Sequence, residues 1–210
     1  MDNKWTQIPT DEVINATIAA LDANNIEAFV VENGEDAKKK FFELVPEGSE
    51  IFTNTSTTLD TLGITEVLNN SGKYTSIKNK VMELAKSEPE NAIHRKQIGS
   101  AMPYATGSVH AITADGHLLI ASGSGSQLPG YAYGADHIVW IAGAHKLVKD
   151  VNEGIKRIYE HSLPLESARM NKVYNTTTGS NPRRILIFNN ENDMNKARTK
   201  LIIVKEVLGF

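Results

Sequence analysis

The sequence predicts an α/β fold: a mainly parallel, Rossmann-like sheet with helices on both faces and an antiparallel hairpin excursion. Short apolar runs typical of buried strands alternate along the chain with segments whose apolar residues recur at helical spacing. An Asp-Gly pair, Asp115-Gly116, separates two strand-like segments and favours a tight antiparallel turn. The 210 residues, 40% of them apolar, suffice for one core, so we expect a single domain over 1–210.

The N-terminal portion, residues 1–50, predicts a helix, a strand and a second helix. Apolar residues recur at helical spacing in "DEVINATIAAL" (11–21), and its two acids suit the positive end of a helix. The apolar run "IEAFVV" (26–31) is typical of a strand, and "ENG" stops it. "EDAKKKFFELV" (35–45) places its apolar residues on one helical stripe.

The alternation continues through the middle of the chain. "EIFT" (50–53) predicts a strand, and the apolar residues of 59–68 predict one helix after it. Thr57 has capping-box spacing to Asp60, which predicts Thr57 as the N-cap of that helix. A further helix is predicted over 90–102.

The second half of the chain predicts more strands around the hairpin. A two-residue turn at Asp115-Gly116 would pair His110 with Ala121. Asp150 is a predicted helix cap, and Pro164 is predicted to end that helix. The strands expected here are "SVHAIT" (108–113), "LLIAS" (118–122), "HIVWIAG" (137–143), "RILIF" (184–188) and "KLIIVKE" (200–206).

Composition excludes several classes of function. A formal net charge of -3 gives no basic field, so we expect no nucleic-acid partner. The absence of cysteine excludes an iron–sulfur cluster held by this chain and leaves any other cofactor unassigned. No apolar run approaches the roughly 18 residues of a membrane span, and residues 1–13 lack a signal-peptide pattern. We therefore expect a cytoplasmic protein with no membrane partner.

The first candidate site is "TNTSTTLDTLG" (53–63), where a predicted strand leads directly into a helix. Free N–H groups in the first helical turn, together with hydroxyl side chains, suit a phosphate or a carboxylate. Helix capping alone would explain one or two of these hydroxyls, but not five. The candidate ligand-binding residues here are Asn54, Ser56, Thr57 and Thr58.

The second candidate site is "SGSGSQLPGY" (122–131), a loop between two predicted strands. Ligands of open α/β sheets bind beyond the carboxyl ends of strands, so this loop and 53–63 could share a ligand. The alternative is a glycine-rich surface connection, and the third glycine and following helix of a dinucleotide site are missing. The candidate residues are Gly123, Ser124, Gly125, Ser126 and Gln127.

The third candidate site is "GAHKLVKD" (143–150), another strand end that precedes a helix. His145 is a candidate anion ligand and Lys146 a candidate for acid–base chemistry, although a solvated lysine is the ordinary alternative. Asp115 is a second acid–base candidate, and its place in a turn explains it equally well. The six histidines show no metal-binding spacing, so no metal site is expected, and no serine-hydrolase elbow or P-loop occurs.

Three segments together resemble the LUD domain family, the lactate-utilisation proteins. They are "ATGSVHAITADGHLLIASGSGSQ", "GADHIVWIAGAHKLVKDVNEGIKRI" and "TKLIIVKEVLGF", and the resemblance runs over about residues 53–210. It implies a fold like that of ribose-5-phosphate isomerases, glucosamine-phosphate deaminases and CoA transferases. Members of that group bind phosphorylated sugars or acyl-CoA with hydroxyl- and glycine-rich loops at strand ends.

Two departures limit what this resemblance implies. Ser126-Gln127 stands where relatives have Asn-Arg, so a fixed cation for an anionic ligand is missing from this loop. Relatives often carry cysteines shortly after the motif that resembles Pro164 to Arg169, and the segment here has none. The iron–sulfur role of larger family members therefore does not carry over.

Three hypotheses follow. The leading one is a LUD-domain protein that binds a small anionic metabolite at the polar loops and serves organic-acid metabolism, specifically lactate utilisation. The second is an isomerase or a CoA-transferase-like enzyme acting on a phosphorylated sugar or an acyl-CoA, with Asp115 or Lys146 as acid–base groups. The third is a non-catalytic subunit that docks on the other subunits of a redox complex.

Overall fold

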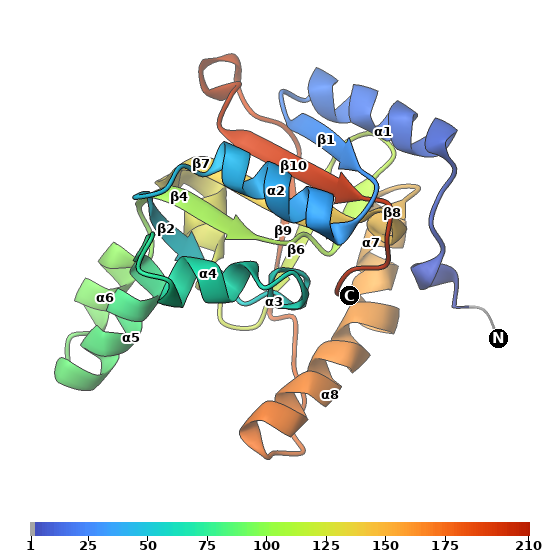
Figure 1. Ribbon diagram of the computed structural model, residues 1–210. Helices are drawn as coiled ribbons and strands as arrows, with labels where there is room; N and C mark the ends of the chain where they lie inside the picture. Colours follow the sequence, from blue (N-terminus) through green and yellow to red (C-terminus); the bar gives the residue numbers. More distant parts are fainter. Residues whose placement is uncertain (1–2) are drawn as a thin grey trace.

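The computed structural model describes residues 3–210 and arranges their strands in two sheets (Figure 1). The larger sheet has six strands in the order β1-β10-β7-β4-β2-β3, and the smaller has four in the order β8-β5-β6-β9. The strands are β1 (Glu27–Val31), β2 (Glu50–Thr53), β3 (Thr75–Ser76), β4 (Met102–Gly107), β5 (Ala111–Thr113), β6 (Leu118–Ser122), β7 (Ala135–Gly143), β8 (Leu147–Val148), β9 (Arg184–Phe188) and β10 (Thr199–Val204).

Helices of three kinds connect the strands. The α-helices are α1 (Asp11–Ala23), α2 (Gly34–Leu44), α3 (Thr57–Thr61), α4 (Ile64–Asn70), α5 (Ile77–Ser87), α6 (Ala92–Ile98), α7 (Val151–Arg157) and α8 (Leu163–Tyr174). Short 3-10 helices are η1 (Lys4–Thr6), η3 (Ala144–Lys146) and η5 (Asp193–Asn195), and π-helical turns are η2 (Gly130–Gly134) and η4 (Ile158–Ser162).

All strand pairs of the larger sheet are parallel, and β6 pairs antiparallel with both β5 and β9. The predicted fold class, a mainly parallel α/β sheet with an antiparallel hairpin, is confirmed. The apolar runs at 26–31, 50–53, 118–122, 137–143, 184–188 and 200–206 all form strands.

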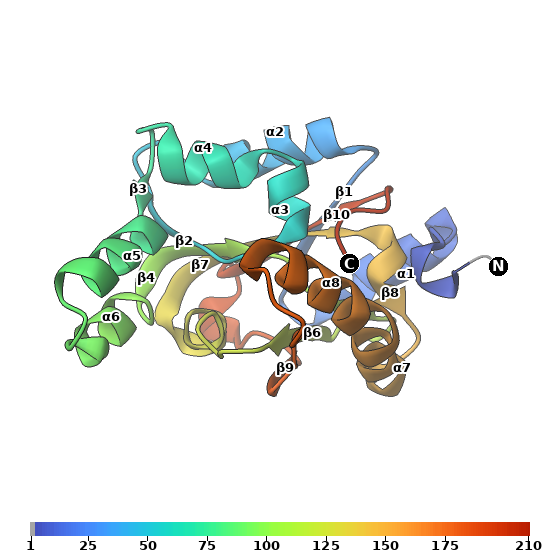
Figure 2. The same ribbon diagram turned by 90° about the horizontal axis from the view of Figure 1, so that it is seen from below.

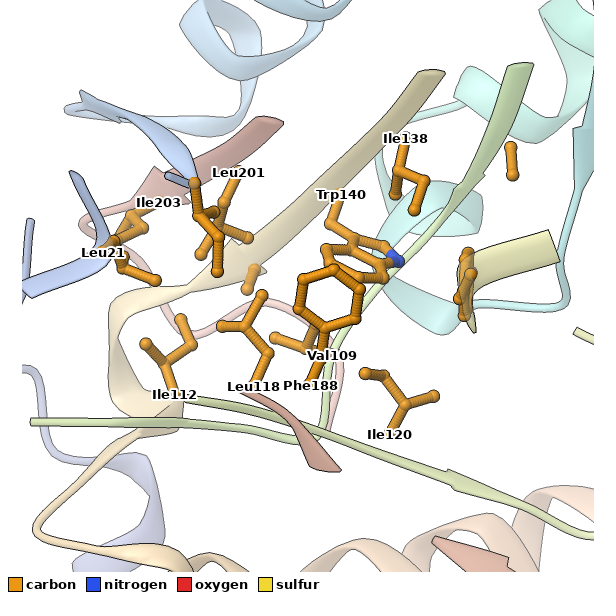
Figure 3. Packing of buried hydrophobic residues seen from close by; sticks show 14 of the residues in the cluster. Leu21, Val109, Ile112, Leu118, Ile120, Ile138, Trp140, Phe188, Leu201 and Ile203 are labelled. Atoms are coloured by element: carbon orange, nitrogen blue, oxygen red, sulfur yellow. The ribbon is translucent and has the colours of Figure 1, made fainter. Parts of the chain in front are cut away.

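The larger sheet buries both of its faces, as alternation along its central strand β7 shows. Val139 and Ile141 point into a cluster formed with α2, α3 and α4. Trp140 points to the other face, where it meets Phe188 of the smaller sheet edge to face at 5.6 Å between ring centroids (Figure 3). Period-two alternation therefore gives one strand two apolar faces, which is typical of parallel sheets.

The molecule consequently has four layers (Figure 2). Helices α2, α3 and α4 cover one face of the larger sheet, and the smaller sheet packs on the other face together with α1. The outer face of the smaller sheet carries a third cluster in which Leu119 and Ala121 pack against Ile158 of η4. Every apolar face of the two sheets is thus covered.

The turn of the hairpin is wider than the predicted two-residue turn. The N–H of Gly116 donates to the carbonyl of Thr113 at 2.9 Å, and the N–H of Thr113 donates to the carbonyl of His117 at 2.9 Å. Gly116 has a φ of 81°, as a glycine bulge after a tight turn requires. The hairpin is confirmed, but the two-residue turn at Asp115-Gly116 is wrong.

The extra turn residue shifts the strand register by one position. Ala111 pairs with Leu119, so the predicted pairing of His110 with Ala121 is wrong. The two residues still meet, because the N–H of Ala121 donates to Nδ1 of His110 at 3.2 Å.

Two helix boundaries also differ from the prediction. Ser56, not Thr57, caps α3, because its hydroxyl accepts a hydrogen bond from the N–H of Leu59 at 3.4 Å. The single helix expected over 59–68 is two helices, α3 and α4, separated at Gly63 with a φ of 67°. A left-handed residue is a common way to end one helix before another begins.

Pro164 does not end the helix that Asp150 caps. The Asp150 carboxylate accepts from the N–H of Glu153 at 2.9 Å as predicted, but α7, η4 and α8 follow one another without a break. Pro164 falls in the first turn of α8, directly after the wider π-helical turn η4. A proline is tolerated there because its ring and missing N–H disrupt the preceding turn least.

The sequence reading missed β4 and α5, and it extended the helix over 90–102 into the start of β4. Strand β4 contains Pro103 and few large apolar residues, so its pattern is weak. Its position between β7 and β2 nevertheless places it at the centre of the larger sheet.

Within residues 3–210 no helix combines the length and apolar character that crossing a membrane requires.

Candidate functional site

A cleft of about 830 Å³ opens where three neighbouring parallel strands end. Strand β2 ends at Thr53, β4 at Gly107 and β7 at Gly143, and residues just beyond each end line the cleft. The loop after β6, helix α8 and residues 178–183 form the rest of its wall. Ligands of parallel α/β sheets bind at such carboxyl ends, because helices and loops leave a crevice there.

Most of the residues singled out in the sequence meet in this one cleft. The lining includes Asn54, Ser56, Thr57, Thr58, Gly123, Ser124, Ser126, Gln127 and Lys146. Gly125 and His145 lie next to lining residues without lining the cleft themselves, and Asp115 is remote from it. The two polar loops, more than 60 residues apart, thus face the same space.

Asp115 has contacts that belong to the hairpin turn. Its carboxylate accepts a hydrogen bond from the hydroxyl of Thr113, and its carbonyl accepts from Nδ2 of Asn24 at 2.9 Å. The side chain is 61% exposed. These contacts tie the hairpin to the end of α1, away from the cleft.

The 53–58 segment uses most of its polar groups to hold the strand ends together. Nδ2 of Asn54 donates to the carbonyl of Thr106 in β4 at 3.1 Å, and Ser56 caps α3. The Thr58 hydroxyl donates to the carbonyl of Leu208 at 3.3 Å. Among these four side chains, only the Thr57 hydroxyl has no hydrogen-bond partner within residues 3–210.

The 122–127 loop is bonded largely to itself. The Ser122 hydroxyl donates to Oε1 of Gln127 at 2.9 Å and accepts from the N–H of Gly125 at 2.8 Å. The hydroxyls of Ser124 and Ser126 lie 3.0 Å apart. Gly125 has a φ of 83°, which a side chain would disfavour. The loop is therefore a wall of the cleft held in shape by its own hydrogen bonds, and not a flexible linker.

Lys146 is the charged group set deepest in the cleft lining. It belongs to η3 directly after β7, and its side chain is 1% exposed. Nζ lies within hydrogen-bond distance of the Ser108 hydroxyl (3.0 Å), the Val109 carbonyl (3.2 Å) and the Thr58 hydroxyl (3.5 Å). Burial lowers the pKa of this amine well below its ordinary value, and the charge of Arg157 lowers it further.

Arg157 lies behind the cleft wall and is fully buried. Its Nη1 donates to the carbonyl of His110 at 2.6 Å and to the Ser162 hydroxyl at 3.3 Å, and both of these residues line the cleft. Among residues 3–210, Nε and Nη2 have no hydrogen-bond partner. Burial lowers the pKa of the guanidinium to about 10, so Arg157 stays charged at neutral pH.

Three histidines complete a buried basic group around Lys146 and Arg157. Burial lowers the pKa of His110 to about 3 and that of His145 to about 3, and the charges of Lys146 and Arg157 contribute in both cases. The pKa of His161 is lowered for the same reasons. We call Lys146, Arg157, His110, His145 and His161 the basic cluster.

No carboxylate forms an ion pair with the basic cluster in the part of the chain that the structure describes. This is unusual for buried charges, which are ordinarily paired. The contrast within the same protein is Arg198, whose buried guanidinium meets the Glu191 carboxylate at 2.6 Å. Arg157 therefore carries a buried charge that no carboxylate of residues 3–210 balances.

The outer part of the cleft carries a second set of cations. Arg169 of α8 holds Glu166 through two hydrogen bonds of 2.6 and 2.7 Å. Lys78 of α5 lines the same wall, and its pKa is lowered mainly by burial. Arg183 lies on the neighbouring segment. The described residues contain no group of three His, Asp or Glu side chains arranged to hold a metal ion.

The sequence reading missed Ser108, Arg157 and His110 as parts of this site. Ser108 follows β4, and its position was hidden because that strand was not predicted. Arg157 lay in the motif "DVNEGIKRI", but nothing in a sequence reveals that an arginine on a helix is fully buried. The predicted register of the hairpin differs by one residue from the observed one, so the predicted position of His110 was wrong.

Comparison with solved structures finds chains similar to this one. A structure of a DUF162 family protein from Deinococcus radiodurans aligns over 93% of this chain and 99% of its own, with a TM-score of 0.53 and 10% identity. Ribose 5-phosphate isomerase from Plasmodium falciparum aligns over 84% and 95%, with a TM-score of 0.39 and 14% identity. Ribose 5-phosphate isomerase A from Neisseria gonorrhoeae aligns over 97% of each chain, with a TM-score of 0.37 and 16% identity.

Sequence comparison identifies the family. No curated protein matches the chain. The family model of the LUD domain matches residues 14–204, which includes the N-terminal elements that the motif resemblance over 53–210 left out. The chain belongs to the LUD domain family.

Proposed function

We propose that this LUD domain protein binds a small anionic metabolite in the cleft at the ends of β2, β4 and β7, and that it serves organic-acid metabolism, specifically lactate utilisation, in the cytoplasm. The observation that carries the proposal is the basic cluster, in which Lys146 lines the cleft and with which no carboxylate of residues 3–210 forms an ion pair.

Compensation of the buried charge supports an anionic ligand. A buried charge without a partner costs several kcal/mol, and proteins retain such a charge mainly where a ligand supplies the partner. Arg157 places positive charge behind the cleft floor, Lys146 lines the floor itself, and the Ser108 and Thr58 hydroxyls supply neutral donors beside it. A carboxylate or a phosphate has the charge and the acceptor oxygens that this arrangement lacks.

The hydroxyl groups that line the cleft support a polar ligand rather than an apolar one. Ser56, Thr57, Ser108, Ser124 and Ser126 all face it. The volume of about 830 Å³ is large for lactate alone, so the cleft has room for a larger organic acid or a phosphorylated metabolite.

An enzyme of the isomerase or CoA-transferase type is the second candidate function. The buried position of Lys146 in the cleft favours it, since an amine with a lowered pKa is suited to proton transfer. Asp115 has no part in this candidate, because it lies in the hairpin turn outside the cleft.

A thermal-shift screen tests the binding proposal. The ligands are L-lactate, pyruvate, sugar phosphates and CoA esters, and a ligand at about 100 times its dissociation constant should stabilise the protein by about 2.7 kcal/mol. We expect Lys146→Met to remove the shift and Lys80→Met, an exposed lysine of α5 outside the cleft, to keep it. A ligand that stabilises both variants equally would place binding elsewhere. No shift with any acid would contradict the proposal and turn attention to the subunits of a redox complex.

A further inference from the structure

We propose that Lys146 is a nucleophilic amine that forms an imine with the carbonyl group of an aldehyde or ketone that also carries a carboxylate or a phosphate. The inference rests on the proposed function, since it assigns a reactive group and a substrate class to the same cleft. Its basis is the position of Nζ among neutral oxygens at the cleft floor, near the Arg157 cation and without an ion pair to any acid of residues 3–210.

The contacts of Nζ suit an uncharged amine. Its three neighbours are two hydroxyls and one carbonyl, those of Ser108, Thr58 and Val109. A neutral amine has two N–H groups and one lone pair, and a hydroxyl can donate to the lone pair as readily as it accepts. A carboxylate at this place would instead hold the amine in its protonated form. The lowered pKa of Lys146 agrees with this geometry.

The neighbouring cation serves two purposes. Positive charge from Arg157 disfavours protonation of Nζ, and desolvation together with a nearby cation is a known way to activate a lysine for imine formation. The same charge attracts the anionic group of the substrate, so that the anion and the carbonyl carbon are held on one side of the cleft. An anionic carbonyl compound fits both requirements, whereas a simple alcohol or amine fits neither.

The step balances without any further reactant. The Nζ lone pair forms a bond to the carbonyl carbon, and the carbonyl oxygen takes up the proton that nitrogen loses. The C–O bond then breaks, the oxygen takes a second proton from nitrogen and leaves as water, and a C=N bond remains. The hydroxyls of Ser108 at 3.0 Å and Thr58 at 3.5 Å from Nζ are placed to pass these protons between nitrogen and oxygen.

Borohydride trapping tests the proposal. The full chain is incubated with pyruvate in one arm and dihydroxyacetone phosphate in the other, and sodium borohydride reduces any imine to a stable secondary amine. Peptide mass mapping then locates the label. We expect a label on Lys146 in at least one arm, and the arm that labels identifies carboxylate or phosphate as the preferred anionic group. A label spread evenly over exposed lysines, or none on Lys146 in either arm, overturns the proposal.

Two variants and one binding measurement separate this inference from the proposed function. Lys80→Met replaces an exposed lysine outside the cleft and should leave the Lys146 label intact, whereas Lys146→Met should abolish it. If Lys146→Met does not fold, site mapping on the wild type and on Lys80→Met still decides the outcome. Calorimetric binding of pyruvate or dihydroxyacetone phosphate without trapping in either arm refutes the imine and leaves the anion site standing. Absence of both binding and trapping in both arms refutes the two together.

Discussion

Among single residues, the buried basic side chains of the candidate site have strongly lowered pKa values. Lys146 and Arg157 are buried and form no ion pair with an acid of the described residues, and two histidines near them have pKa values of about 3. Each group costs stability when it is protonated inside the protein. The residue types were visible in the sequence, but their burial and mutual approach depend on contacts between distant segments, which a sequence does not give.

The histidines predict a specific pH dependence of stability. In the unfolded chain a histidine binds a proton below about pH 6.5, whereas folded His145 does so only near pH 3, so the unfolded state binds more protons between these values. We expect the free energy of unfolding to fall by up to about 1.4 kcal/mol per pH unit per histidine as the pH decreases through this window.

Chemical denaturation at pH 7, 6 and 5 measures this effect. The variant His145→Leu should show a smaller loss of stability on acidification than the wild type. Equal slopes for the wild type and His145→Leu would mean that His145 is not held neutral in the folded protein.

At the scale of elements, the predicted alternation of helices and strands was right wherever apolar residues formed long runs or clear stripes. The strands at 118–122 and 137–143 are almost entirely buried, and their sequences show it. The prediction failed where packing overrides local pattern. Strand β4 contains Pro103 yet sits in mid-sheet, and Pro164 continues a helix because a π-helical turn precedes it.

The hairpin between β5 and β6 gives a test of packing between elements. A methyl group on Gly116 would lie 2.7 Å from the backbone of Ala20 in α1, and Gly116 has a φ of 81°. Gly72 has a similar φ of 77° with nothing within 4 Å of an added Cβ. We expect Gly116→Ala to cost about 1–3 kcal/mol more than Gly72→Ala, because only the first adds a steric clash to backbone strain.

Urea denaturation of the two glycine variants measures the difference directly. Because the φ angles are alike, the difference isolates the contact between the hairpin and α1. Equal losses of stability would show that the hairpin does not pack on α1 as described.

At the scale of the whole molecule, the site arises from three strand ends that the topology brings together. The order β7-β4-β2 in the larger sheet places Lys146, Ser108 and Asn54 around one cleft, although they are far apart in the sequence. The sequence predicted two of these three positions, because polar residues followed recognisable strands. The position of Ser108 was not predicted, because β4 was not predicted. The contact between Ser108 and the buried Lys146 was therefore not predicted either.

Binding of an anion should couple the cleft to proton uptake. A bound anion that carries no aldehyde or ketone group favours the charged forms of Lys146 and of the histidines nearby, so their pKa values rise and protons enter from the buffer. The uptake is expected to be greatest where the bound protein and the free protein differ most in protonation, near neutral pH.

Titration calorimetry tests most directly whether the cleft at Lys146 binds an anion. The ligand is the organic acid or phosphate that gives the largest thermal shift, and the titration is carried out in two buffers of different ionisation enthalpy. We expect binding accompanied by net proton uptake, and at least about tenfold weaker binding for Lys146→Met, which corresponds to about 1.4 kcal/mol. Binding of equal affinity in the wild type and Lys146→Met, or no binding by the wild type, would contradict this expectation.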